Sequence, residues 1–70
     1  MAKTPTRAQL RKLAESKGID IGINPHGHEY DLDHKTWRLN IQAENRDYAG
    51  LRRVVETLLR ALPDKGGPHG

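Results

Sequence analysis

Apolar positions in the first part of the chain follow the helical period and predict a helix from about Pro5 to Lys17. One face of this helix collects Leu10, Leu13 and Ala14. Thr4 can cap its N-terminus ahead of Pro5, and Thr6 with Gln9 offers an alternative capping box. Gly18 follows as a stop, because glycine readily adopts the left-handed conformation that ends many helices.

The middle of the chain follows a period of two and predicts three strands. Isoleucine at every second position of Ile19–Ile23 indicates a half-buried strand, and Asn24–Gly27 supplies a turn. His28–Ile41 predicts a hairpin around a His34-Lys35 loop. Its apolar residues then face one another: Leu32 opposite Trp37, Tyr30 opposite Leu39, and His28 opposite Ile41. Asp31 meets Arg38 on the other face, and a one-residue slip would separate the apolar sets.

A second helix is predicted from about Tyr48 to Leu62, with Asn45 or Asp47 as its N-cap. Its apolar stripe is broad and consists of Tyr48, Leu51, Val54, Val55, Leu58, Leu59 and Leu62. Pro63 ends the helix, and residues 63–70 are predicted to be a disordered C-terminal tail. The order α-β-β-β-α predicts an α+β fold with a single domain over residues 1–62. We expect a two-layer sandwich with a three-stranded antiparallel sheet and both helices on one face.

Composition adds three constraints. With 34% hydrophobic residues in 70, the core must be lean, and all three aromatic residues (Tyr30, Trp37 and Tyr48) are assigned to it. The lean core and an unpaired strand edge favour homodimerisation. The absence of cysteine excludes disulfides and thiolate zinc sites. No long apolar run is present, so we expect no membrane span and a cytoplasmic protein.

Charge is segregated along the chain. Residues 1–18 and 46–70 together carry a net charge of +6, whereas residues 19–45 carry −3. If the helices share one side of the sheet, the domain is bipolar. Its basic helical side favours a polyanion, and its acidic sheet face favours a cationic partner.

The segment Pro25–Tyr30, at the start of the predicted second strand, carries a resemblance. With the element order over roughly residues 7–62, the chain resembles the small domains of double-stranded RNA binders and of HicA-type toxins, which are mRNA-cleaving enzymes. Those toxins carry a histidine after a glycine near the start of the second strand, which assigns the catalytic position to His28. This chain has Gly27 and His28 adjacent, where the family has a small polar residue between them. It also has Arg46–Gly50 where double-stranded RNA binders carry a lysine cluster.

The chemistry of His28 suits RNA cleavage without a metal ion, because histidine can transfer protons near neutral pH. Such a site also needs a cation for its phosphorane-like transition state, and the candidates are Lys35, Arg38 and Arg46. The competing interpretation is that His28 only covers the edge of the core beside Ile41. His26 and His28 project to the same side, but without a third ligand we expect neither a metal nor a cofactor. We favour a function without catalysis.

Charged surface residues supply the two candidate binding surfaces. The candidate nucleic-acid contacts are Arg7, Arg11, Lys12, Arg46, Arg52, Arg53 and Arg60, although solvent-facing helices commonly carry such residues. The candidate protein-interaction residues, on the second strand, are Glu29, Asp31 and Asp33. These carboxylates lie roughly 6.6 Å apart along a strand, so three in a row cannot converge on one cation.

Three functions follow from these observations. The first is a small nucleic-acid-binding domain, RNA ahead of DNA, that uses basic helices. The second is a protein–protein interaction factor, such as a phage-type inhibitor or host-takeover protein, that docks through the acidic sheet face or a helix. The third is a HicA-like mRNA-cleaving toxin with His28 as its catalytic residue.

Overall fold

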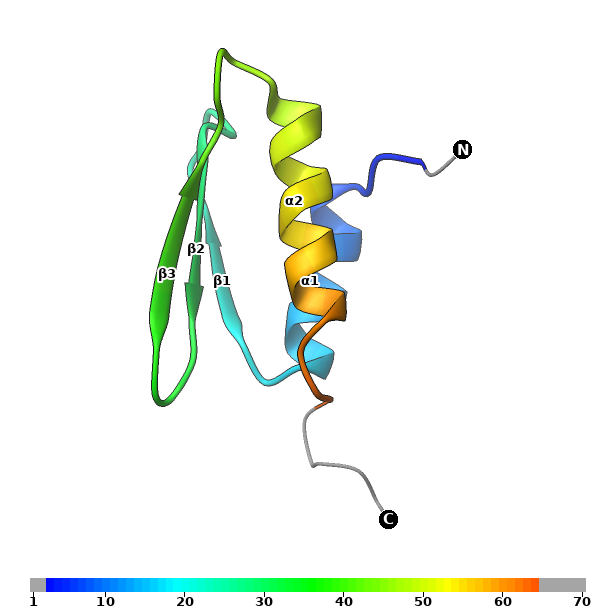
Figure 1. The fold of residues 1–70 in the computed structure, drawn as a ribbon, viewed down its shortest axis with the longest axis vertical. Helices are drawn as coiled ribbons and strands as arrows, with labels where there is room; N and C mark the ends of the chain where they lie inside the picture. Colours follow the sequence, from blue (N-terminus) through cyan, green and yellow to red (C-terminus); the bar gives the residue numbers. More distant parts are fainter. Residues whose placement is uncertain (1–2, 65–70) are drawn as a thin grey trace.

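Two helices cover one face of a three-stranded antiparallel sheet in the computed structural model, which describes residues 3–64 (Figure 1). The elements follow in the order α1 (Arg7–Ser16), β1 (Asp20–Ile23), β2 (Glu29–Asp33), β3 (Arg38–Gln42) and α2 (Tyr48–Arg60). The strands lie in sequence order, so β2 is central and β1 and β3 are the two edges. This arrangement confirms the predicted α+β fold.

A capping box begins α1. The N–H of Gln9 donates to Thr6 Oγ1 at 3.1 Å, and the N–H of Thr6 donates to Gln9 Oε1 at 2.8 Å. The Thr4–Pro5 cap is therefore wrong, because Pro5 precedes the capping residue. At the other end Gly18 has a φ of 71°, as expected for a glycine stop.

The hairpin of β2 and β3 is two positions out of the predicted register. The observed pairs are Tyr30 with Ile41, Leu32 with Leu39, and Asp33 with Arg38. The loop is centred on Lys35 and Thr36, because the N–H of His34 donates to the Trp37 carbonyl at 2.8 Å and closes it. A shift of two preserves the strand period, so the apolar residues still share the helix-facing side.

The core lies between the helices and the helix-facing side of the sheet. Its buried residues all come from predicted apolar positions: Leu10, Ala14, Ile19, Tyr30, Leu32, Leu51, Val55 and Leu59. Tyr30 is buried in the core and the half-buried Trp37 packs against it, whereas Tyr48 is half-buried and is not among the residues that pack against the core, so its assignment was wrong. Trp37 and Tyr48 follow the hairpin loop and the cap of α2, respectively, and so lie at the margins of the sandwich.

The N-terminus of α2 depends on Asp47 and Gly50. Asp47 Oδ1 accepts the N–H of Gly50 at 2.9 Å, which confirms Asp47 as the N-cap. A Cβ at position 50 would collide with the Asp47 carboxylate. The glycine that weakens this first turn therefore also makes room for the cap. The helix ends at Arg60, two residues before the predicted Leu62.

Lys17 fastens the chain that follows α2 to the end of α1. Its Nζ donates to the Leu62 carbonyl at 2.7 Å and to Asp64 Oδ1 at 2.8 Å, and its side chain is only 10% exposed. Most of the predicted tail, residues 65–70, lies outside the described residues, and its disorder stays a prediction. Within residues 3–64, no helix has the length and apolar character needed to cross a bilayer.

Candidate nucleic-acid interface

Charge is divided between the two layers of the fold. The parts of the described chain that form the helical layer, residues 3–18 and 46–64, carry nine Lys/Arg and four Asp/Glu. The open face of the sheet, which points away from the helices, carries four carboxylates: Asp20, Glu29, Asp31 and Asp33. Arg38 shares that face. The segregation seen in the sequence is therefore also present on the folded surface.

A groove between α1 and α2 gathers cations on the helical side. Lys3, Lys12 and Arg60 line it together with Glu56, and its volume is about 460 Å³. We call these four residues the basic groove. Arg60 Nη2 donates to Glu56 Oε2 at 3.1 Å, so one carboxylate partly offsets three cations. The remaining positive charge can attract phosphate groups.

Two arginines of α2 hold the segment that leads into α1. Arg52 Nε donates to the Pro5 carbonyl at 3.0 Å, and Arg53 Nη1 donates to Thr4 Oγ1 at 2.9 Å. Arg52 is half-buried and has a structural role in this contact, whereas Arg53 is exposed. These two bonds hold residues 4 and 5 against α2 and so position the neighbouring Lys3 in the basic groove.

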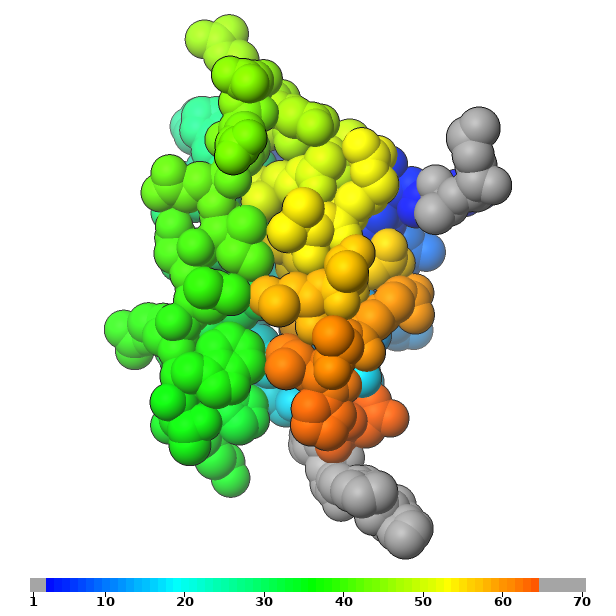
Figure 2. Space-filling view, viewed as in Figure 1, coloured from blue at the N-terminus to red at the C-terminus, as the bar shows by residue number. Residues whose placement is uncertain are grey.

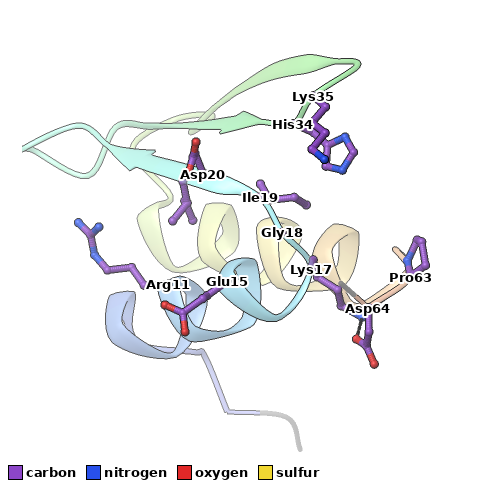
Figure 3. A pocket seen from close by; sticks show the side chains of 11 residues that line it. Arg11, Glu15, Lys17, Gly18, Ile19, Asp20, His34, Lys35, Pro63 and Asp64 are labelled. Carbon is purple, nitrogen blue, oxygen red and sulfur yellow. Dashed lines mark hydrogen bonds and ion pairs between the residues drawn. The ribbon is translucent and has the colours of Figure 1, made fainter. Parts of the chain in front are cut away.

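The predicted cations Arg7 and Arg11 lie on the other flank of α1, towards β1. A Cβ added at Gly27 would stand 2.9 Å from Arg7 Nη2, which shows that the guanidinium of Arg7 reaches the β1–β2 turn. Arg11 lines a separate cleft with Glu15 and Asp20 (Figure 3). The seven predicted cations thus lie on different sides of the molecule and do not form one patch.

The cleft of Figure 3 has a volume of about 800 Å³ and lies where α1 ends, β1 begins and the hairpin loop turns. Its charges balance, with Arg11, Lys17 and Lys35 against Glu15, Asp20 and Asp64. His34 also lines the cleft, and its Nδ1 is buried without a hydrogen-bond partner among the described residues. A balanced lining does not favour a polyanion, so we do not include the cleft in the interface.

His28 lies at the opposite end of the hairpin, in a hollow that it shares with Arg46 and Tyr48. The His28 ring is exposed and stacks between two others, with its centroid 5.3 Å from His26 and 5.4 Å from Tyr48. We call His28, Arg46 and Tyr48, with His26 stacked beside them, the His28 hollow, which the carboxylate of Glu29 also lines. Of the three cations proposed to assist His28, the structure brings only Arg46 into it. The other two belong to the loop end of the hairpin.

The pairing of His28 differs from the prediction. Its carbonyl accepts the N–H of Ala43 at 2.8 Å, so His28 does not stand opposite Ile41. Sequence reasoning also missed Tyr48, which it placed in the core, and Lys3, which it did not include among the candidate cations. The position of Tyr48 directly after the predicted helix cap could have revealed its exposure, because a residue at the start of a helix lies at the margin of the core.

Asn40 organises the acidic sheet face. Its Nδ2 donates to Asp31 Oδ1 at 2.7 Å and to Glu29 Oε1 at 2.9 Å. Arg38 lies 3.5 Å from Asp33, not next to Asp31, as a consequence of the register shift. An amide carries no charge, so the face stays negative and disfavours nucleic acid. Within residues 3–64, no three His, Asp or Glu side chains are grouped to hold a metal ion.

Comparison of the chain with protein-family models, with curated proteins and with solved structures finds no match. The resemblance to HicA-type toxins and double-stranded RNA binders therefore stays a prediction.

Proposed function

We propose that this chain is a small nucleic-acid-binding domain that contacts the phosphate backbone through its helical side. The observation that supports the proposal is the division of charge between the layers. Cations collect on the side of α1 and α2, while four carboxylates occupy the open sheet face. A phosphate backbone is attracted to the first surface and repelled by the second.

The basic groove is the centre of this interface. Lys3, Lys12 and Arg60 line it, and the exposed Arg53 lies on the same helix as Arg60. Contacts of this kind fix the position of a nucleic acid but carry little sequence information. We therefore propose binding with weak sequence preference. The proposed preference for RNA rests on the similarity of the element order to that of double-stranded RNA binders.

Fluorescence anisotropy with labelled RNA and DNA duplexes tests this function. Lys12→Glu combined with Arg60→Gln should weaken RNA binding roughly tenfold or more, since two phosphate contacts are lost and one is replaced by repulsion. Lys35→Glu is the control for charge reversal outside the groove, because Lys35 is an exposed cation on the hairpin loop. Equal effects of the two changes, or no binding by the unmodified chain, would refute the proposal. In the second case the acidic sheet face becomes the place to look for a partner.

A second candidate function, ribonuclease activity, is favoured by the His28 hollow. The ring of His28 stacks on His26 on one side and on Tyr48 on the other, and Arg46 lines the same hollow. Two imidazoles can divide the roles of general base and general acid, and a guanidinium can stabilise a phosphorane-like transition state. The proposed catalyst is His28, in agreement with the position that HicA-type toxins suggest.

Incubation with a long single-stranded RNA decides whether this activity exists. Cleavage should disappear in His28→Ala and persist in His34→Ala, whose histidine lies at the loop end of the hairpin. Intact RNA after prolonged incubation with the unmodified chain would exclude the ribonuclease and leave the binding function in place.

A further inference from the structure

The outer edge of β3 is open. Ala43 donates its N–H to the His28 carbonyl and His34 donates to the Trp37 carbonyl, so these pairs mark the residues that bond to β2. Because bonding alternates along an antiparallel strand, the intervening residues direct their N–H and C=O groups away from β2. These residues are Arg38, Asn40 and Gln42. Within residues 3–64 no strand lies beyond β3.

Apolar side chains are exposed on the same side of the molecule. The exposed large hydrophobic residues of the described chain are Leu39, at 39%, and Val54, at 54%. Val54, which the sequence placed in the apolar stripe of α2, lines a shallow, mainly apolar surface with Leu58 and Ala61, to which Arg53 and Thr57 also contribute. The opposite flank of α2 faces α1 through Glu56. Figure 2 shows β3, in green, beside α2, in yellow and orange, on one face of the molecule.

We propose that this β3–α2 side, made of the outer edge of β3 with Leu39, Val54 and Leu58, binds a second copy of the chain. The sequence of β3 is self-complementary about Asn40. Antiparallel pairing of two copies places Arg38 opposite Gln42, Leu39 opposite Ile41, and Asn40 opposite its own counterpart. All the outward N–H and C=O groups of both strands are then satisfied.

The two-fold axis of such a pair is perpendicular to the sheet. The helix-facing sides of the two sheets therefore lie on the same side of the dimer. Leu39 and Ile41 of one copy meet Ile41 and Leu39 of the other on the helix-facing side. The exposed Val54 and the half-buried Leu58 of the two α2 helices approach each other above this seam. The pairing therefore covers the apolar residues that the single chain leaves open.

Charge favours β3 over β1 as the joining edge. The carboxylates of the open face belong to β1 and β2, whereas β3 contributes Arg38, Asn40 and Gln42. The two β2 strands would lie about 14 Å apart, three strand spacings, so repulsion between them is screened by physiological salt. Arg38 would stand between Asp33 of its own strand pair and Gln42 of the second copy. Joining through β1 would instead bring Asp20 of the two copies close together.

A dimer of this form extends the proposed function without depending on it. It would have a continuous six-stranded sheet with four helices on one face. The basic grooves of both copies would then lie on the same side, and a single polyanion could engage both.

Sedimentation velocity of the full chain over a concentration series tests the proposal. The unmodified chain should show a species of twice the chain mass that dissociates on dilution. Asn40→Pro removes an outward N–H with no partner inside the chain, and should weaken dimerisation at least tenfold. Asn40→Ala removes the same side chain but keeps the N–H, and should remain dimeric.

A second pair of variants covers the case in which proline prevents folding. Val54→Lys places a charge in the apolar seam. This variant should be folded by far-ultraviolet circular dichroism and monomeric by sedimentation velocity. Ala8→Lys, at an exposed position of α1, should leave the dimer intact. A monomer at every concentration, or a dimer that survives Val54→Lys, would overturn the proposal. Neither result depends on nucleic-acid binding, so the two proposals fail separately.

Discussion

The Asp47 carboxylate occupies the space in which a side chain at Gly50 would begin, and it accepts the N–H of Gly50 at 2.9 Å. Glycine in a helix ordinarily costs about 1 kcal/mol relative to alanine. Here the same glycine allows the N-cap of α2 to form, and a cap of this type contributes roughly 1 kcal/mol. Two effects that are normally independent are therefore coupled at the start of α2.

A double-mutant cycle should reveal this coupling. In the Asp47→Ala background, Gly50→Ala should raise the free energy of unfolding by about 1 kcal/mol, as helix propensity dictates. In the unmodified chain the same change should give little gain or a loss, because it displaces the cap. The measurement is urea denaturation of the four proteins at one concentration. Equal effects of Gly50→Ala in both backgrounds would mean that the two residues are not coupled.

Lys17 and Lys12 should differ sharply when each is changed to methionine. Lys17 donates to the Leu62 carbonyl and pairs with Asp64, and its side chain is 10% exposed. Lys17→Met should lower the free energy of unfolding by roughly 1 kcal/mol, because it leaves that carbonyl without its donor. Lys12 is exposed on the same helix, and Lys12→Met should change stability within about 0.5 kcal/mol. Similar losses for both would show that the Lys17 contact contributes nothing to stability.

The glycines of β1 and of the following turn should respond in opposite directions to alanine. Gly22 lies on the open sheet face, where a Cβ would meet Asp31 Cβ at an ordinary 3.7 Å. Gly22→Ala should therefore stabilise the chain by about 0.5–1 kcal/mol. Gly27 has a φ of 75° and lies against Arg7, so Gly27→Ala should destabilise it by about 1–2 kcal/mol. Thermal unfolding of the two variants is sufficient, and melting shifts of the same sign would contradict this prediction.

The salt dependence of RNA binding should report the number of phosphate contacts. Each contact contributes about 0.9 to the slope of log affinity against log salt for a duplex. Lys12→Gln should reduce this slope by nearly that amount, and Arg60→Gln should reduce it further. Lys35→Gln should leave the slope unchanged. Titrations at four salt concentrations measure this slope. An unchanged slope in both groove variants would mean that the phosphate groups bind to another surface of the chain.

Local patterns in the sequence predicted most of the fold. The helical periods of α1 and α2 and the alternation of β1 and β2 specify which side chains are buried, and the buried core residues all come from those predicted apolar positions. The hairpin register was wrong because patterns of period two cannot distinguish registers that differ by two. The decision depended on which residues closed the loop, and the bond from His34 to Trp37 is not visible in a chain without an Asn-Gly turn.

The candidate site was less predictable, because it depends on which flank of a helix each cation occupies. Arg7 and Arg11 were grouped with Lys12, yet they lie on the β1 side of α1 while Lys12 faces the groove. Arg52 appeared to be a free cation until its bond to the Pro5 carbonyl was known. His28 stacks on Tyr48 because the open end of the hairpin lies next to the start of α2. No local pattern in the sequence specifies that these two segments are neighbours.

The positions of Lys3 and Asp64 have a practical consequence for how the protein is produced. Lys3 lines the basic groove, whereas Asp64 is held by Lys17 at the other end of the helices. An affinity tag joined to the N-terminus would therefore begin beside the proposed phosphate contacts, and a polyhistidine tag there could create spurious binding. A tag joined to the C-terminal end would instead follow on from Asp64, so RNA binding that both fusions share would identify the binding that belongs to the chain itself.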